Sequence, residues 1–495
     1  MPLAITVLTV YYLALMLLCV YAAHRYHLLY LLRRHRHTQA APGKIRHYPV
    51  VTLQIPLFNE RYVVARLLDA VRALDYPREK LEIQILDDST DDTPRIVEGL
   101  AADMMQLGFD IHHLRREDRQ GYKAGALAAG MAQARGEFIA IFDADFCPAP
   151  DFLLKTLPYF EEDAVGMVQG RWGYFNRNHS LLTQAQAIFL DAHFMIEHLA
   201  RYRSGCFFNF NGTAGIWRRQ CLLDAGGWQA DTLTEDLDIS YRAQLAGWRF
   251  VFAPEVVAPS ELPADMAAFR LQQHRWVKGS IQTARKLLQT ILASSCSRQV
   301  KLESFFHLTN NFVYPLMILF LAAMLPVMVL REQLGWEWLV WLDLPLLLFV
   351  APAAWLFYLT GQKLTQRNWL REIARIPLAT AIGTGLALNN VRAVLEGLFG
   401  HDVEFRRTPK FGGSGISAGR HYTVRADWIT ALEIAFGIYF GTCAVYALSH
   451  QHYLAVPFML VFQSGFLGVA LASLVPHMPF RRRRRGASET VWAIK

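Results

Sequence analysis

Four long apolar runs constrain this chain more than any other feature of its sequence. They cover residues 1–23, 312–330, 338–360 and 428–475. About 20 apolar residues cross the hydrocarbon core of a bilayer as one helix. The runs therefore predict five membrane helices, near residues 3–23, 306–330, 338–360, 428–449 and 453–475. Hydrophobic residues make up 53% of the chain and charged residues only 19%, which excludes a disordered protein.

The positive charges beside these runs indicate which side of the membrane each segment faces. Arginines cluster within residues 33–36 and 481–485, next to the first and the last apolar run. Cytoplasmic flanks of membrane helices carry an excess of Lys and Arg. We therefore expect both clusters in the cytoplasm, together with the mixed segment 44–300. No nucleic-acid partner is expected, despite the net charge of +8.

Residues 373–399 form a further apolar segment, which Pro377, Gly383 and Gly385 interrupt. If this segment crossed the membrane completely, the basic residues after it and the arginine-rich tail would lie outside. We therefore expect an amphipathic helix in the cytoplasmic interface and a cytoplasmic C-terminus. The chain shows no internal repeat of the kind that transporter halves have, which weakens a transporter interpretation.

Residues 50–145 alternate between short apolar runs and amphipathic stretches. The pattern predicts strands at 50–56, 81–86, 110–114 and 137–142, and helices at 62–74, 94–107 and 122–134. This pattern is typical of a parallel α/β sheet, in which ligands bind at the carboxyl ends of the strands. Acidic residues follow the predicted strands at those ends, and no GxGxxG or Walker A loop is present to hold phosphates.

Two carboxylates and a lysine are candidates for holding a phosphate group at this edge. Asp143 and Asp145 follow the fourth strand and offer oxygens to a hard divalent cation, which keeps open positions for phosphate oxygens. Lys123 lies near the N-terminus of a predicted helix, where it could meet a phosphate. Each signal has an ordinary alternative. A DxD sequence is more often a loop, Asp88 could cap the helix near Thr93, and Lys123 could be a surface lysine.

Four motifs occur in order along the chain. They are Asp87-Asp88, Asp143-Ala-Asp145, Thr234-Glu-Asp236 and Gln272-Gln-His-Arg275-Trp276. With these motifs the sequence resembles the family 2 glycosyltransferases, the inverting membrane-integrated group that includes cellulose, chitin and hyaluronan synthases and ceramide glucosyltransferase. Residues 54–60, 86–91, 210–218 and 272–276 look most like the plant cellulose-synthase-like A and C enzymes, the glucomannan and xyloglucan-backbone synthases. The resemblance covers residues 48–425.

The resemblance implies a fold class and a division of the chain. The fold class is an α/β GT-A-type cytoplasmic glycosyltransferase domain, inserted in an α-helical transmembrane bundle of about five spans with interfacial helices. The expected parts are an N-terminal transmembrane helix (1–32), the GT-A catalytic domain (44–260), interfacial helices with the QxxRW motif (261–300), two transmembrane helices (304–362), an interfacial helix (370–400), a gating-type loop (401–427), two more transmembrane helices (428–476) and a basic cytoplasmic tail (477–495).

An inverting transfer from a nucleotide sugar needs a base that deprotonates the acceptor hydroxyl and positive charge that stabilises the departing diphosphate. The resemblance implies that Asp236 is this base, with Glu235 beside it in the catalytic motif. Because the motif opens a predicted helix, Thr234 and Asp236 could instead only cap that helix.

The resemblance also implies how the donor is held. Arg275, Lys123 and an Mg²⁺ or Mn²⁺ ion on Asp143 and Asp145 would bind the diphosphate. Asp88 would accept a hydrogen bond from the nucleobase.

Four more residues would border the same pocket. Pro56 and Glu60 would lie on the donor side, and Gln272 and Trp276 would line the acceptor end. A tryptophan face suits the apolar face of a pyranose, although an aromatic residue on a buried helix is more often core.

A last segment resembles the FxVTxK gating loop of bacterial cellulose synthase. It is Phe405-Arg-Arg-Thr408-Pro-Lys410, and it departs from the pattern at Arg407, where the bacterial loop has valine. The resemblance implies that Phe405, Thr408 and Lys410 contact the donor. A basic loop on the membrane surface is the alternative.

These features predict an inverting β-glycosyltransferase that uses GDP-mannose or UDP-glucose to extend a β-linked polysaccharide such as β-1,4-mannan or glucan, and that passes the chain through the membrane. One alternative is a glycolipid synthase that transfers one sugar to ceramide or diacylglycerol, and another is a non-catalytic transporter or scaffold. The expected partners are the nucleotide sugar, a glycan or lipid acceptor and membrane lipid. The expected location is a membrane with a cytoplasmic catalytic domain, the inner membrane of a bacterium.

Overall fold

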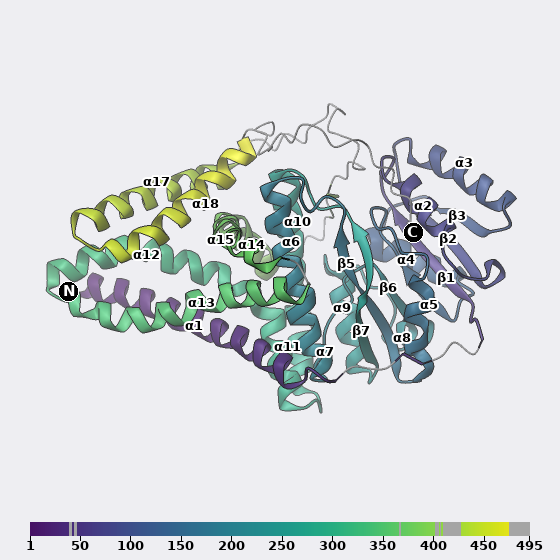
Figure 1. Cartoon of the computed structure of the whole chain (residues 1–495), viewed down its shortest axis with the longest axis horizontal. Helices are drawn as coiled ribbons and strands as arrows, with labels where there is room; N and C mark the ends of the chain where they lie inside the picture. The colour runs from purple at the N-terminus through teal and green to yellow at the C-terminus, as the bar shows by residue number, and fades with distance from the viewer. Residues whose placement is uncertain are drawn as a thin grey trace.

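The computed structural model describes residues 1–38, 42–43, 47–365, 368–400, 405, 407–408 and 427–474. Figure 1 shows two parts along the long axis of the molecule, a bundle of long helices that holds the N-terminus and a twisted sheet flanked by helices. Helix α10 (Met266–Ala293) runs between the two parts, across the direction of the bundle helices.

The sheet has seven strands in the order β3-β2-β1-β4-β6-β5-β7. Their bounds are β1 Val51–Leu57, β2 Leu81–Asp87, β3 Asp110–Arg115, β4 Phe138–Ile141, β5 Val165–Tyr174, β6 Gly215–Arg218 and β7 Arg249–Ser260. Strands β3, β2, β1 and β4 pair in parallel, which confirms the prediction for the first half of the domain. Beyond β4 the sheet is mixed, because β6 runs antiparallel to both β4 and β5.

The helices of the first half cover both faces of the sheet. They are α2 Val64–Arg72, α3 Thr93–Gln106 and α4 Tyr122–Gln133. Leu67 of α2 and Val97 of α3 join one buried apolar cluster, whereas Leu127 of α4 joins another with Ile139 and Ile141 of β4. Strands that are buried on both faces carry continuous apolar runs, as this sequence does. The parallel strands direct their carboxyl ends to one edge of the sheet.

Later helices complete the domain. They are α5 Phe152–Thr156, α6 Leu181–Ala192, α7 Leu199–Arg203, α8 Arg219–Asp224 and α9 Glu235–Leu245, with a π-helical turn at His193–His198 between α6 and α7. Of these, α6 and α9 contribute residues to a cleft at that edge. Helices α9 and α10 carry the two later motifs. The start of α10 is capped by Asp265, whose carboxylate accepts a hydrogen bond of 2.7 Å from the backbone N–H of Ala268.

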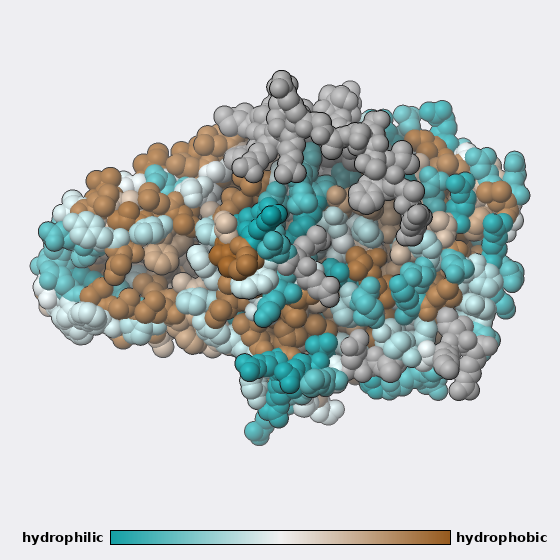
Figure 2. All heavy atoms as spheres, in the orientation of Figure 1, coloured by the Kyte–Doolittle hydropathy of each residue, from teal (hydrophilic) through white to brown (hydrophobic). Residues whose placement is uncertain are grey.

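Among the described residues, five helical segments are long and apolar enough to cross a membrane. They are α1 Pro2–Arg34, α11 Arg298–Thr309 with α12 Val313–Leu334, α13 Val340–Leu364, α17 Trp428–Ser449 and α18 Val456–Leu474. Each overlaps one of the predicted spans, and Figure 2 shows apolar residues over much of the outer face of the bundle. Side chains such as Leu348 and Val445, 63% and 67% exposed, suit contact with lipid better than contact with water.

The interrupted segment forms three short helices, α14 Trp369–Ile373, α15 Ile376–Gly385 and α16 Ala387–Phe399. The axis bends by 45° between Gly385 and Ala387. Helix α15 packs against α18 so closely that a side chain at Gly385 would strike the backbone oxygen of Gly465. Figure 1 shows α15 nearly end-on beside the lengthwise bundle helices. The position of this segment in the membrane interface stays a prediction. The direction of α15, across the bundle helices, supports it.

Candidate active site

Side chains from the strand ends, from α9 and α10 and from Phe405, Arg407 and Thr408 meet in one cleft of about 1250 Å³, open mouth included. Besides Phe405, twelve of the other thirteen predicted site residues line it. They are Pro56, Glu60, Asp88, Lys123, Asp143, Asp145, Glu235, Asp236, Gln272, Arg275, Trp276 and Thr408. The thirteenth, Lys410, lies outside the described residues. We call the part built from residues after β1 to β4 the strand wall, and the part built from α9 and α10 the helix wall.

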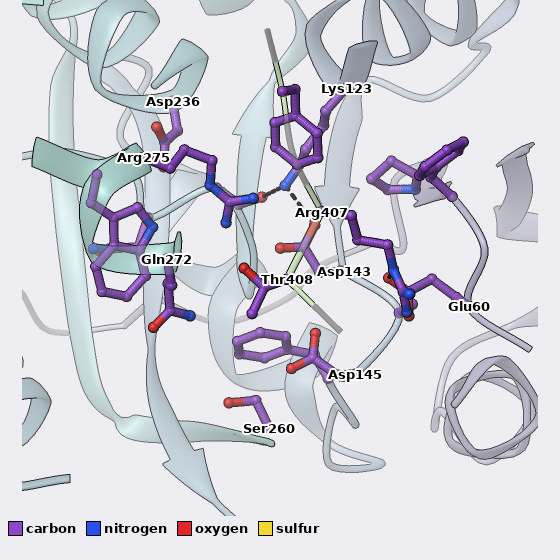
Figure 3. Close-up of a pocket in the computed structure, with 18 of the residues that line it drawn as sticks. Glu60, Lys123, Asp143, Asp145, Asp236, Ser260, Gln272, Arg275, Arg407 and Thr408 are labelled. Atoms are coloured by element: carbon purple, nitrogen blue, oxygen red, sulfur yellow. Dashed lines mark hydrogen bonds and ion pairs between the residues drawn. The ribbon is translucent and has the colours of Figure 1, made fainter. Parts of the chain in front are cut away.

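Lys123 is the central cation of the strand wall. Its Nζ donates to Asp143 Oδ1 at 2.5 Å and to the backbone oxygen of Gly212 at 2.8 Å, as Figure 3 shows. Burial by itself would lower the pKa of Lys123, but the charges of Asp143, Glu235 and Asp236 together outweigh burial and hold that pKa above its ordinary value. Lys123 is therefore an ion-paired cation inside the cleft and not a surface lysine.

Asp143 and Asp145 occupy the turn after β4. The hydroxyl of Thr213 accepts a hydrogen bond of 2.9 Å from the backbone N–H of Asp143, which holds the turn in place. Asp145 is only 4% exposed and Asp143 is partly exposed. Among the described residues, no group of three or more His, Cys, Asp and Glu side chains could enclose a metal ion. Two carboxylates alone fit a hard cation that takes its other ligands from water and a substrate diphosphate.

The helix wall begins with the partly buried pair Glu235 and Asp236 at the start of α9. Thr234 makes no side-chain cap, and its hydroxyl lies 3.2 Å from the hydroxyl of Thr283 instead. Asp236 Oδ1 accepts a hydrogen bond of 2.8 Å from the backbone N–H of Leu237. Burial raises the pKa of Asp236 to about 7, and the charge of Glu235 adds to the rise. Burial also raises the pKa of Glu235.

The two walls touch at Gly212. Its φ of +80° is strained for any other residue, and a Cβ there would lie 3.0 Å from Asp236 Oδ2 and 3.4 Å from Lys123 Nζ. Glycine at this position lets the main chain pass between the carboxylate of one wall and the lysine of the other.

Gln272, Arg275 and Trp276 lie three and four residues apart on α10 and therefore share one face of that helix. The guanidinium carbon of Arg275 lies 4.6 Å from the ring centroid of Phe405. Burial lowers the pKa of Arg275 from its ordinary value, although an arginine keeps its charge. The ring of Trp276 lies 6.4 Å from that of Trp172, so an aromatic corner closes this end of the cleft.

Phe405, Arg407 and Thr408 line the cleft instead of lying on a membrane surface. Arg407 donates to both carboxylate oxygens of Glu60, at 2.8 Å from Nε and 2.6 Å from Nη2 (Figure 3). Thr408 is 4% exposed, and its hydroxyl has no hydrogen-bond partner among the residues that the structure describes. In the sequence, Arg407 stands out only as a departure from the loop pattern. Its position inside the loop motif was the one available signal for a role at the site.

The sequence also offered no indication of a role for two arginines after β3. Arg116 donates to both oxygens of Asp88, at 2.9 Å from Nε and 2.5 Å from Nη2. Asp88 therefore does not cap α3, and its carboxylate is held in one orientation. Arg119 lies with its guanidinium carbon 3.3 Å from the ring centroid of Phe58. The basic character of residues 115–119 was visible in the sequence, but nothing in that run indicates which arginines turn into the cleft.

Comparisons with known proteins agree with this geometry. A profile described as "Glycosyltransferase like family 2" matches residues 49–279. The "Glucomannan 4-beta-mannosyltransferase 1" of Cyamopsis tetragonoloba is 33% identical over 440 residues, which are 84% of this chain and 80% of that protein. The "Glucomannan 4-beta-mannosyltransferase 2" of Arabidopsis thaliana is 33% identical over 444 residues, with the same coverage.

Among solved structures, a mannosyltransferase from Pyrobaculum calidifontis in complex with GDP-Man and Mn²⁺ matches with a TM-score of 0.53 and 21% identity. The match covers 80% of this chain and 98% of that one. At this level of identity the likeness concerns the fold, a sheet of the GT-A type.

Proposed function

This chain belongs to glycosyltransferase family 2, and on that premise we propose that it transfers mannose from GDP-mannose to a growing β-1,4-linked polysaccharide. The chain is an integral membrane hexosyltransferase of the inverting type. The choice of mannose rests on two observations. The relatives that align over four-fifths of their own length carry glucomannan 4-beta-mannosyltransferase in their names. The solved mannosyltransferase of the same fold holds GDP-Man.

One observation carries the chemical part of the proposal. A partly buried carboxylate with a pKa of about 7, Asp236, lies in the same cleft as the cation Lys123 and the carboxylates Asp143 and Asp145. A base works best when its pKa is near the working pH, and a leaving diphosphate needs nearby positive charge. The alternative that this domain is a degenerate scaffold requires the loss of these groups, and all of them are present.

In the proposed step, the proton of the acceptor hydroxyl moves to Asp236. The hydroxyl oxygen forms the new bond to C1 of the sugar, and the bond between C1 and the diphosphate oxygen breaks on the opposite face. Arg275 and Lys123 stabilise the charge that develops on the departing GDP. Gly212 keeps the space beside the Asp236 carboxylate open, because a Cβ at this position would lie 3.0 Å from Asp236 Oδ2.

Asp143 and Asp145 would hold Mg²⁺ or Mn²⁺ together with the diphosphate of the donor. The ion would neutralise charge on the phosphate oxygens. Thr408, which has a buried hydroxyl without a partner, would donate to a donor oxygen, and we propose the same side of the cleft for Lys410. Gln272 and Trp276 would bind the acceptor glycan at the other end.

The catalytic domain faces the cytoplasm in this proposal, because Arg33 and Arg34 lie at the end of α1 that packs against the sheet domain. The relatives named above come from plants, so the expected bacterial inner membrane has no support from them and is not part of the proposal. The growing glycan is the proposed acceptor, and membrane lipid surrounds the bundle.

A donor screen with detergent-purified protein tests the proposal. The protein is incubated with Mn²⁺ and with GDP-mannose, GDP-glucose or UDP-glucose, and released GDP or UDP is measured. We expect GDP release from GDP-mannose and a product that an endo-β-1,4-mannanase digests. A single-sugar product soluble in chloroform would replace the polymer proposal with a glycolipid synthase. UDP release from UDP-glucose alone would replace the donor.

A further inference from the structure

Arg270 is a buried arginine to which the proposed mechanism assigns no role. It lies on α10, one and a half turns before Arg275, and is only 5% exposed. Its Nη1 donates to the Ser473 hydroxyl of α18 at 3.1 Å and to Glu433 Oε2 of α17 at 3.5 Å. Its Nη2 lies 3.7 Å from Oδ1 of Asp427, the residue that caps α17. One guanidinium therefore connects α10 to two membrane helices.

Arg270 and the motif residues lie on opposite sides of α10. An α-helix completes a turn in about 3.6 residues, so Gln272 lies about half a turn from Arg270. Arg275 and Trp276 lie on the side of Gln272, and this side lines the cleft, as Figure 3 shows for Gln272 and Arg275. Contacts that fix Arg270 against the membrane helices therefore also fix the direction of the side that faces the cleft.

The first turns of α10 are held differently from the later turns. In the later part, Gln272 has been passed and Gln282 Oε1 accepts a hydrogen bond of 2.9 Å from the backbone N–H of Leu233. In the first turns, Met266 and Phe269 belong to an apolar cluster with residues of α6, α15 and α18. Apolar contacts are not directional. The ion contacts of Arg270 supply the direction that the apolar contacts of these turns lack.

Two other basic residues on the side of Arg270 contribute less. His274 Nε2 and Lys278 Nζ lie 3.1 Å and 3.4 Å from Glu396 Oε2 of α16. The Glu396 side chain is 32% exposed, whereas that of Glu433 is fully buried. Exposed ion pairs are screened by water and hold a position weakly. The buried contacts of Arg270 are therefore the stronger constraint on this part of α10.

Stability by itself does not account for the pair of Arg270 and Glu433. Desolvation of two buried charges offsets most of their attraction, and apolar residues of similar size often stabilise a fold as well. Glu433 Oε1 has no hydrogen-bond partner among the described residues, which adds a further cost. What the guanidinium adds is geometry, because it is planar and its N–H groups point in fixed directions.

From these contacts we propose that Arg270 is a positioning residue, which sets the rotation of the first turns of α10 and thereby directs the Arg275 guanidinium at the donor diphosphate. A guanidinium that binds two phosphate oxygens must lie in their plane, so a small rotation of the helix loses part of this contact. The inference rests on the proposed role of Arg275 and adds the residue that orients it.

Binding of nucleoside diphosphates to the full-length protein tests the inference without turnover. Calorimetry with Mn²⁺ gives the Kd of GDP and of UDP, which share the diphosphate. Arg275→Met should weaken binding of the preferred nucleotide by about 10- to 100-fold, the effect of losing hydrogen bonds between charged groups. Arg270→Met should weaken it by about tenfold, because part of the same contact is lost. Arg270→Lys, which keeps the charge, should recover part of the affinity.

The double variant shows whether Arg270 acts through Arg275. In the Arg275→Met background no guanidinium is left to orient, so Arg270→Met should have no further effect on the Kd. The same loss of affinity in both backgrounds would overturn the inference, since Arg270 would then act by another route. An unchanged Kd in Arg270→Met with Arg275 intact would overturn it as well.

A second double variant separates position from stability. Arg270→Met leaves the Glu433 carboxylate buried without its partner, which should lower Tm. The added change Glu433→Leu removes that charge, so Tm should return to the wild-type value. Nucleotide binding should stay weak, because two apolar side chains do not fix the direction of the helix. Recovery of binding together with Tm would overturn the inference, since the pair would then only stabilise the fold.

Arg331→Met is the matched control. Arg331 of α12 is a buried arginine of the same helical bundle, and its Nη1 lies 2.6 Å from Asp343 Oδ2 of α13. The change should lower Tm, for the reason given for Arg270→Met, and should leave the Kd of the nucleotide as in the wild type. A loss of affinity equal to that of Arg270→Met would overturn the inference, because any weakened bundle would then disturb the cleft.

The inference and the proposed function can fail separately. A wild-type protein that binds UDP and not GDP would contradict the choice of GDP-mannose, and the variants of Arg270 would then be compared with UDP. A wild-type protein that uses GDP-mannose, but in which Arg270→Met binds GDP normally, would contradict only the inference. A protein that binds neither nucleotide with Mn²⁺ would contradict both.

Discussion

The two walls of the cleft treat charge in opposite ways. On the strand wall two carboxylates are paired with cations, Asp143 with Lys123 and Asp88 with Arg116. On the helix wall Glu235 and Asp236 are neighbours, and both pKa values are raised. Paired charges keep their ionisation fixed, whereas a carboxylate with a pKa near neutrality can exchange a proton. The difference indicates that proton transfer belongs to the helix wall, whereas the metal and nucleotide contacts belong mainly to the strand wall, with Arg275 of the helix wall as an added diphosphate contact.

The largest effect is expected for Asp236→Asn, which tests this division because it removes the proton acceptor and keeps the shape of the side chain. We expect turnover to fall by about 10²- to 10⁴-fold. GDP affinity should be kept, because the strand wall is intact. Sugar transfer and calorimetric GDP binding measure the two effects. A variant that keeps wild-type turnover would place the base elsewhere, and one that loses GDP binding would contradict the division.

Asp145→Asn should act on the opposite wall. Loss of one carboxylate ligand should raise the Mn²⁺ concentration that gives half-maximal activity by at least about 10- to 100-fold. Removal of a group that only supports a metal ligand already lowers metal affinity by this factor. At saturating Mn²⁺ much of the turnover should return. A metal titration of activity measures this shift. An unchanged Mn²⁺ dependence would mean that Asp145 is structural. Chelation of the metal with EDTA is the control, and it should abolish transfer by the wild type.

Arg116→Met tests whether pairing on the strand wall matters for the donor. The change leaves Asp88 as a buried carboxylate without its partner, which destabilises a fold more than removal of both charges does. We expect the donor KM to rise by about tenfold, and Tm to fall. The double variant Arg116→Met with Asp88→Asn should regain Tm, because no unpaired charge remains. Equal Tm values for the single variant and the wild type would show that the pair contributes nothing to stability.

The smallest expected effect concerns the pH profile of the helix wall. Asp236 acts as a base only when it is ionised, so kcat/KM should fall as the pH drops through about 7. The charge of Glu235 raises that pKa, and Glu235→Gln removes this charge. The acid limb of the profile should therefore move to lower pH in Glu235→Gln. An acid limb that stays in place would show that Glu235 does not set the ionisation of Asp236.

Much of the fold could be predicted from local patterns. The first four strands and the five membrane helices depend on apolar runs whose length and period follow from burial in a sheet or in lipid. The antiparallel strand β6 was not predicted, because Gly215–Arg218 is too short to show a period. The motif residues were predicted as a set, and twelve of them do line one cleft.

The ion-pair partners of these residues could not be predicted from the sequence. Arg407 lies 347 positions from Glu60, and Arg116 lies 28 positions from Asp88. No spacing rule connects such pairs, since each depends on where a loop turns after its strand or helix. Among the described residues, Arg119 Nε has no hydrogen-bond partner. This too depends on the folded cleft, because Arg119 lies beside Phe58 and the nearby Asp88 is already paired with Arg116.

The order and chemistry of the residues by themselves determined the membrane class, the parallel half of the sheet and the carboxylates and arginine that we propose for the reaction. Only the tertiary structure decided which charges neutralise one another, because ionisation depends on burial and on the nearest opposite charge. Asp143 and Asp236 are the same residue type, yet one pairs with Lys123 and the other has a pKa of about 7. Their surroundings in space, and not their places in the chain, make that difference.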